Sequence, residues 1–196
     1  MLRLHPFQDE PALDGLSLEA ALRWSRSELQ LQFRLKGPKD QLICPPETPE
    51  PRRLDGLWNS TCLEAFFGIP GLTQYWEFNI SPSGDWNLYR LEDYRRGLTR
   101  ETGMGIQAIS FQPSVGDSEC SLEAEICLDL GETFVAVGEL EYSLTAVVEQ
   151  KDFGLSFWAL QHCSDEADFH RRESFRFTEP NNPVNGDNKT EDILVL

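Results

Sequence analysis

The chain has 196 residues, a length that suits one domain. Its 33 acidic residues outnumber its 17 basic residues, which gives a formal net charge of −16. A field of this sign repels a phosphate backbone and an anionic bilayer, so the charge argues against nucleic acid and membrane surfaces as partners.

The N-terminal residues and the cysteines favour a cytoplasmic protein. Residues 1–10 lack a long apolar core and become acidic at once, so they do not predict a secretory signal. No run approaches the roughly 18 apolar residues that a membrane span needs. Five cysteines, an odd number without a C-x-x-C pair, favour free thiols, with Cys62, Cys120 and Cys127 buried, over a disulfide framework or structural zinc.

Alternating apolar and polar residues predict antiparallel strands along most of the chain. Residues 17–24 also fit a short helix capped by Ser17, but the alternation favours a strand. A proline-rich stretch at 44–56 predicts a loop, and Ser81–Gly84 predicts a turn. The predicted strands are 18–24, 29–35, 62–67, 74–80, 85–91, 106–112, 122–126, 140–149, 155–161 and 174–178.

Nine or more short strands without a long helix predict an all-β fold. The expected architecture is an antiparallel two-sheet β-sandwich of jelly-roll or immunoglobulin-like type, in a single domain. We expect this domain to cover residues 1–178 and to be followed by a polar C-terminal tail at 179–196.

Three blocks of sequence occur in order along the chain. They are LWNSTCLEAFFG (57–68), YWEFNISPSGDWNLYRLEDYR (75–95) and FWALQHCSDEADFHRRESF (157–175). Together they resemble the DOMON-like domain family, which is related to the family-nine carbohydrate-binding modules. The resemblance implies a β-sandwich that holds a sugar or a haem on one concave face, and it leaves open which of the two. It also draws attention to Arg95, because the family motif ends there.

Side-chain alternation predicts a mixed polar face on the central hairpin. Trp76, Phe78 and Ile80 share one face of residues 75–80, so the other face carries Glu77 and Asn79. Sugar hydroxyls pair with carboxylates and amides, and sugar C–H faces stack on aromatic rings. The candidate ligand-binding residues are therefore Glu64, Glu77, Asn79, Asn87 and Tyr89, with Trp58, Trp86 and Trp158 as stacking platforms and Arg95 from the motif.

We therefore predict a non-catalytic module that binds a small molecule, with a saccharide as the expected ligand and no metal site. Two other functions stay open. Met104 and His162 could ligate a haem, and Glu64 and Glu77 could form the paired carboxylates of a glycan-acting enzyme. The sequence names no cofactor, and it settles neither calcium binding nor the oligomeric state.

A purely structural interpretation also stays open. Glu64 could accept hydrogen bonds from Arg95 or from a backbone turn, and Asn79 and Asp85 could cap the Ser81–Gly84 turn. His162 and His170 could fix their loop through Asp168 and backbone groups.

Overall fold

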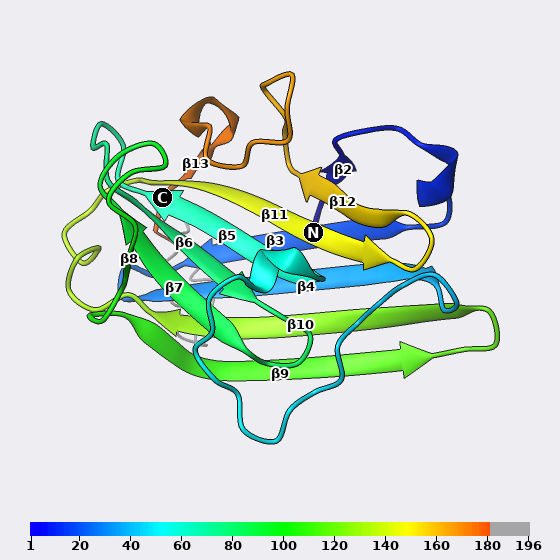
Figure 1. The fold of residues 1–196 in the computed structure, drawn as a ribbon. Helices are drawn as coiled ribbons and strands as arrows, with labels where there is room; N and C mark the ends of the chain where they lie inside the picture. The colour runs from blue at the N-terminus through cyan, green and yellow to red at the C-terminus, as the bar shows by residue number, and fades with distance from the viewer. Residues whose placement is uncertain (181–196) are drawn as a thin grey trace, which may run out of the picture.

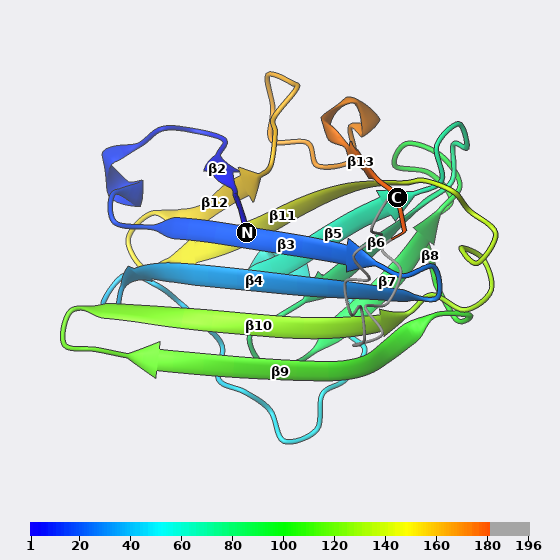
Figure 2. The same cartoon turned by 180° about the vertical axis from the view of Figure 1, so that it is seen from behind.

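The computed structural model describes residues 1–180 as two facing antiparallel sheets (Figure 1). The first sheet, sheet A, has five strands, and it faces the viewer in Figure 2. In spatial order they are β1 (Leu2–Arg3), β3 (Ser17–Trp24), β4 (Glu28–Pro38), β10 (Glu119–Asp129) and β9 (Gly105–Val115).

The second sheet, sheet B, carries the three blocks of sequence described above. Strand β13 (Arg176–Thr178) pairs with the first residues of β11 (Leu140–Gln150), on the same edge of β11 that pairs with β12 (Gly154–Ala159). Short 3₁₀ turns lie at η1 (Pro11–Leu13), η2 (Leu57–Asn59) and η3 (Arg172–Ser174). The spatial order of the other strands is β2 (His5–Pro6), β12 (Gly154–Ala159), β11 (Leu140–Gln150), β5 (Cys62–Gly68), β6 (Tyr75–Ile80), β7 (Trp86–Leu91) and β8 (Thr99–Arg100).

The hydrophobic core fills the space between the sheets, as the alternation predicts. Leu122, Ala124 and Ile126 of β10 are buried, and Trp76 and Phe78 of β6 meet them from the opposite sheet. The ring of Trp76 stacks on Phe67 at 6.0 Å between centroids, and its Nε1 donates a hydrogen bond to Glu101 Oε2 at 2.8 Å. The single-domain, two-sheet β-sandwich fold is therefore confirmed, and residues 17–24 form a strand.

The central strands β5 and β6 of sheet B are buried on both faces, which alternation alone does not predict. All residues of β5 and β6 are buried, including the polar ones on the side away from sheet A. The segment at residues 160–175, here called the β12–β13 segment, accounts for part of this cover, since Phe175 packs in a second cluster with Phe66 and Tyr75. This second cluster closes one side of the pocket described below.

The expectation for the cysteines is met only in part. All five cysteines are free, but Cys62 alone among them is buried, while Cys120 and Cys127 are half-buried. The proposed tail lies outside the described residues from 181 onwards. Among residues 1–180 there is no helix of the length and apolarity needed to cross a bilayer.

Candidate functional site

Strand register brings the predicted polar side chains together on the outer face of sheet B. Asn79 of β6 lies opposite Glu64 of β5 on one side and Asn87 of β7 on the other. One row further along, Glu77 lies between Phe66 and Tyr89. The two acids therefore occupy neighbouring strands on the same face, in diagonal positions that place long side chains within reach of each other.

A pocket of about 440 Å³ lies over this face. Strands of sheet B form its floor, and the η2 turn, the turn after β7 and the β12–β13 segment form its walls. Aromatic and aliphatic side chains dominate the lining, and the polar groups are few. The lining residues are Trp58, Glu64, Phe66, Glu77, Leu91, Arg95, Leu98, Val147, Phe157, Ala167, Phe169 and His170.

The two carboxyl groups are buried and are bonded to neutral donors. Glu64 is 3% exposed, and its Oε2 accepts a hydrogen bond from the Thr145 hydroxyl at 3.0 Å. Glu77 is 5% exposed, and its Oε1 accepts one from Asn79 Nδ2 at 2.8 Å. Burial, reinforced by the charge of Glu77, raises the pKa of Glu64 to about 8, and burial also raises the pKa of Glu77.

His170 enters the pocket from the β12–β13 segment. Its Nδ1 lies 2.8 Å from the Tyr75 hydroxyl, and its Nε2 lies 3.9 Å from Glu77 Oε2. Burial, with a further contribution from the Arg95 charge, lowers the pKa of His170 to about 4, so the imidazole is neutral at pH 7. Sequence reasoning gave His170 only a loop-fixing role, because no periodicity shows where a loop residue points.

Arg95 lines the pocket, but its guanidinium pairs with a residue of the β12–β13 segment. Its Nη2 donates to Asp168 Oδ1 at 2.9 Å, and its backbone N–H donates to the Tyr75 hydroxyl at 3.3 Å. The bond from Arg95 to Glu64 that the structural interpretation offered is absent, and Thr145 fills that role. Asp168 also accepts the backbone N–H of His170 at 3.1 Å, so it does fix this loop.

Asn87 and Tyr89 lie on the predicted face, but their polar groups are engaged with a neighbouring loop. Asn87 Oδ1 accepts from Arg53 Nη2 at 3.0 Å, and its Nδ2 donates to Asp55 Oδ1 at 2.8 Å. The Tyr89 hydroxyl donates to the same Asp55 oxygen at 2.8 Å. Both residues therefore anchor the loop before η2. The Tyr89 ring also packs against the Trp58 ring, with 6.1 Å between the two ring centroids.

Only Trp58 among the three predicted stacking residues lines the pocket. Trp158 is 2% exposed in the core, where its Nε1 donates to Ser156 Oγ at 2.9 Å. Trp86 packs against the core as well, with the Arg53 guanidinium 4.8 Å above its ring. The alternation that turns Asn87 outward turns its neighbour Trp86 to the other face, so a platform formed with Trp86 and Trp158 does not exist.

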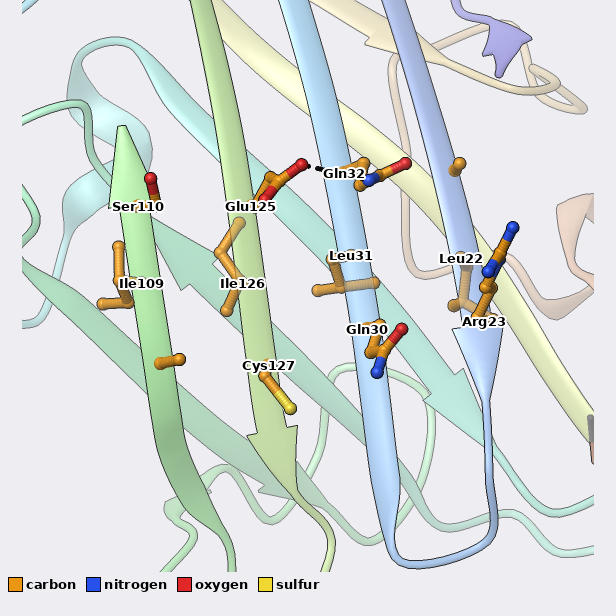
Figure 3. Close-up of a pocket in the computed structure, with 12 residues that line it drawn as sticks. Leu22, Arg23, Gln30, Leu31, Gln32, Ile109, Ser110, Glu125, Ile126 and Cys127 are labelled. Carbon is orange, nitrogen blue, oxygen red and sulfur yellow. Dashed lines mark hydrogen bonds between the residues drawn. The ribbon is translucent and has the colours of Figure 1, made fainter. Parts of the chain in front are cut away.

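A second hollow crosses the outer face of sheet A (Figure 3). Side chains from β3, β4, β9 and β10 border it, and Gln32 Nε2 donates to Glu125 Oε1 at 3.2 Å. Its lining offers amides, an arginine and a thiol, but no aromatic ring. The pocket on sheet B, which combines buried acids with rings, is therefore the stronger candidate for a ligand site.

The structure does not assemble the predicted haem ligands. Met104 packs in the core between the sheets, whereas the ring of His162 contacts Phe7 and Phe169 outside sheet B. His162 Nε2 lies 2.9 Å from the backbone oxygen of His5. Across residues 1–180, no group of three or more His, Cys, Asp or Glu side chains is placed to hold a metal ion.

Comparisons with known proteins establish the fold and leave the family open. No protein-family model matches the chain, and no curated protein matches its sequence. A solved structure from Bacteroides uniformis, provisionally described as a carbohydrate-binding protein, aligns with a TM-score of 0.63 and 12% identity, over 92% of this chain and 87% of that one.

A family-nine carbohydrate-binding module from Caldicellulosiruptor kristjanssonii is also similar in two solved complexes. The complex with glucose aligns at a TM-score of 0.46 and 13% identity, over 93% of this chain and 84% of that one. The complex with cellotriose aligns at a TM-score of 0.46 and 12% identity, over 99% of this chain and 89% of that one. At 12% identity, the similarity to the Bacteroides uniformis structure shows a shared β-sandwich fold and no more.

Proposed function

We propose that the chain is a non-catalytic carbohydrate-binding module whose ligand occupies the pocket on the outer face of sheet B. The lining of that pocket carries the proposal. Buried carboxyl groups of Glu64 and Glu77 face a cavity of about 440 Å³ that Trp58, Phe66 and Phe169 enclose with aromatic rings. Sugars are recognised by this combination, because carboxyl oxygens bind their hydroxyls while rings cover their C–H faces.

Two further observations support the proposal. The pocket volume lies in the range of small-molecule sites, which typically combine an apolar wall with a few placed polar groups. The structural neighbour from Bacteroides uniformis, provisionally described as carbohydrate-binding, shares the fold along most of both chains.

The experiment that tests the proposal is calorimetric titration of the protein with β-1,4-linked trisaccharides built on glucose, on N-acetylglucosamine and on glucosamine. We expect at least one to bind, and we expect Trp58→Ala to weaken it about tenfold through loss of a ring contact. Trp58 is 38% exposed, so its removal should leave the fold intact. Phe177→Ala removes an exposed ring on β13 as a control. Flat titrations with all these sugars would refute the proposal.

Glycoside hydrolysis is a second candidate, favoured by one observation. Glu64 and Glu77 lie on the same face, and burial keeps Glu64 protonated at neutral pH, as a general acid requires. Incubation with cellotriose followed by chromatography of the products tests it. Release of glucose that Glu64→Gln abolishes would establish hydrolysis. Recovery of the intact trisaccharide would exclude hydrolysis and leave non-catalytic binding as the proposed function.

A further inference from the structure

Neither acid of the pocket forms an ion pair with a Lys or Arg side chain among residues 1–180, although the nearby charge of Arg95 offsets part of the rise that burial causes in the pKa of Glu77. His170 is within 4.0 Å of Glu77, but its imidazole is neutral at pH 7. Arg95 also lines the pocket, and its guanidinium is paired with Asp168 at 2.9 Å. Burial disfavours the ionised forms of both acids, and a ligand that supplies a positive charge would stabilise those forms, so it would gain more here than a neutral one.

The hydrogen-bonding groups around the pair are rich in acceptors. The donors that reach Glu64 and Glu77 are neutral, namely the Thr145 hydroxyl and the Asn79 amide. The Oδ1 atom of Asn79 is itself buried and has no hydrogen-bond partner. Since Asn79 lies opposite Glu64 and two residues from Glu77, three acceptor side chains gather at one point of the sheet. An ammonium group carries three donors and no acceptor, which matches this set.

The rest of the lining favours an organic cation over a metal ion. Phe66, Phe157 and Phe169 place rings beside the acids, and an ammonium group on a carbon skeleton is stabilised by ring faces. A hard divalent cation instead requires about six or more oxygen ligands. Residues 1–180 contain no metal-binding cluster of acidic, histidine or cysteine side chains.

We propose that the pocket on sheet B selects an amino sugar with a free ammonium group, which binds between Glu64 and Glu77. This inference rests on the proposed carbohydrate-binding function and specifies the class of saccharide. The sugar ring would lie among the aromatic side chains, and the ammonium group would donate hydrogen bonds to the two acids, which both line the pocket.

The test compares three β-1,4-linked trisaccharides that differ only at C2 of each ring. Cellotriose has a hydroxyl group at C2, and the glucosamine trimer has an ammonium group there. The N-acetylglucosamine trimer has an uncharged acetamido group at the same position. Titrations at about 0.15 M salt limit the general attraction of a cation to an acidic protein. We expect the glucosamine trimer to bind at least about tenfold more tightly than the other two, the gain typical of charge-assisted hydrogen bonds.

Two variants and a matched control locate the effect. Glu77→Gln and Glu64→Gln each keep the side-chain shape and should each reduce the preference for the amine, with thermal melting confirming that the variants are folded. Glu139→Gln removes the same charge from an exposed position and should keep the preference.

The possible outcomes distinguish a failure of the amine inference from a failure of the proposed carbohydrate-binding function. Equal or tighter binding of a neutral trisaccharide would overturn the amine inference and leave carbohydrate binding in place. An amine preference that persists in both pocket variants would also overturn the amine inference. The overall negative charge of the protein, not the pocket, would then cause the preference. Failure of all three trisaccharides to bind would refute the proposed function itself.

Discussion

The Tyr75 hydroxyl lies 2.8 Å from Nδ1 of His170, although the two residues are 95 positions apart in the chain. The same hydroxyl accepts the backbone N–H of Arg95 at 3.3 Å. We infer that the tyrosine donates its proton to Nδ1, which leaves the imidazole hydrogen on Nε2, facing Glu77. This bond ties β6 to the β12–β13 segment and sets the face that His170 presents to the pocket.

Tyr75→Phe should therefore lower the free energy of unfolding. The change leaves Nδ1 of a buried imidazole without its donor, which costs about 1–3 kcal/mol. Urea denaturation measures the loss. Tyr142→Phe is the control, because the Tyr142 hydroxyl makes no hydrogen bond within residues 1–180, and we expect it to have little effect. Similar losses in the two variants would show that the hydroxyl of Tyr75 contributes nothing specific.

The buried carboxyl of Glu64 should make stability fall as pH rises. Its folded pKa of about 8 exceeds the unfolded value of roughly 4.3, so the folded state retains a proton that the unfolded state loses. The stabilisation is complete below the unfolded pKa and is lost as pH rises through the folded pKa. In this window the slope for one group approaches about 1.4 kcal/mol per pH unit.

Glu64→Gln isolates this contribution, because glutamine keeps the shape and does not titrate. Relative to the wild type, the variant should gain stability between pH 5 and pH 8, by more than about 1 kcal/mol in urea denaturation. A stability difference that stays constant across this range would show that Glu64 titrates normally in the folded protein.

Side-chain direction on the central hairpin could be predicted from the sequence, because strand geometry dictates it. Alternation alone places Trp76 in the core and Glu77 on the outer face, and the structure agrees. The cover over that outer face could not be predicted. His170 reaches the pocket from a loop that Asp168 holds in place, and no periodicity indicates orientation in a loop.

Long-range partners account for the differences at Asn87 and Glu64. Asn87 is on the predicted face, yet Arg53 and Asp55, more than 30 residues earlier, use its polar atoms. The donor to Glu64 is Thr145, which β11 brings alongside β5. Pairing between distant strands is set by the whole fold, so neither partner could be chosen from local sequence.

Asp168→Asn should loosen the β12–β13 segment. The carboxylate accepts hydrogen bonds from Arg95, from the Tyr94 hydroxyl and from the backbone of His170, and Arg171 Nε lies 3.3 Å from it. Asparagine loses the charge that strengthens these bonds, so we expect faster trypsin cleavage after Arg171. Asp165→Asn, in the same segment but exposed, should leave the cleavage rate unchanged. Equal rates in wild type and Asp168→Asn would contradict this role.

Arg95 has a backbone φ of 51°, in the left-handed region that non-glycine residues seldom adopt. Its guanidinium holds Asp168, so the residue combines a local backbone cost with a long-range bond. Arg95→Ala removes the bond and keeps the strained backbone, while Arg95→Gly removes both. The glycine variant should therefore be about 1 kcal/mol more stable than the alanine variant in urea denaturation.

The same pair of substitutions at Arg96 provides the control. Arg96 does not have a positive φ, so glycine there should be less stable than alanine by about 0.5–1 kcal/mol, because it loses more backbone entropy on folding. The two Arg95 variants should bind any one of the three trisaccharides with the same affinity, since both lack the guanidinium at the pocket wall. If glycine is no more stable than alanine at position 95, the left-handed backbone costs nothing, and the bond to Asp168 alone explains why an arginine stands there.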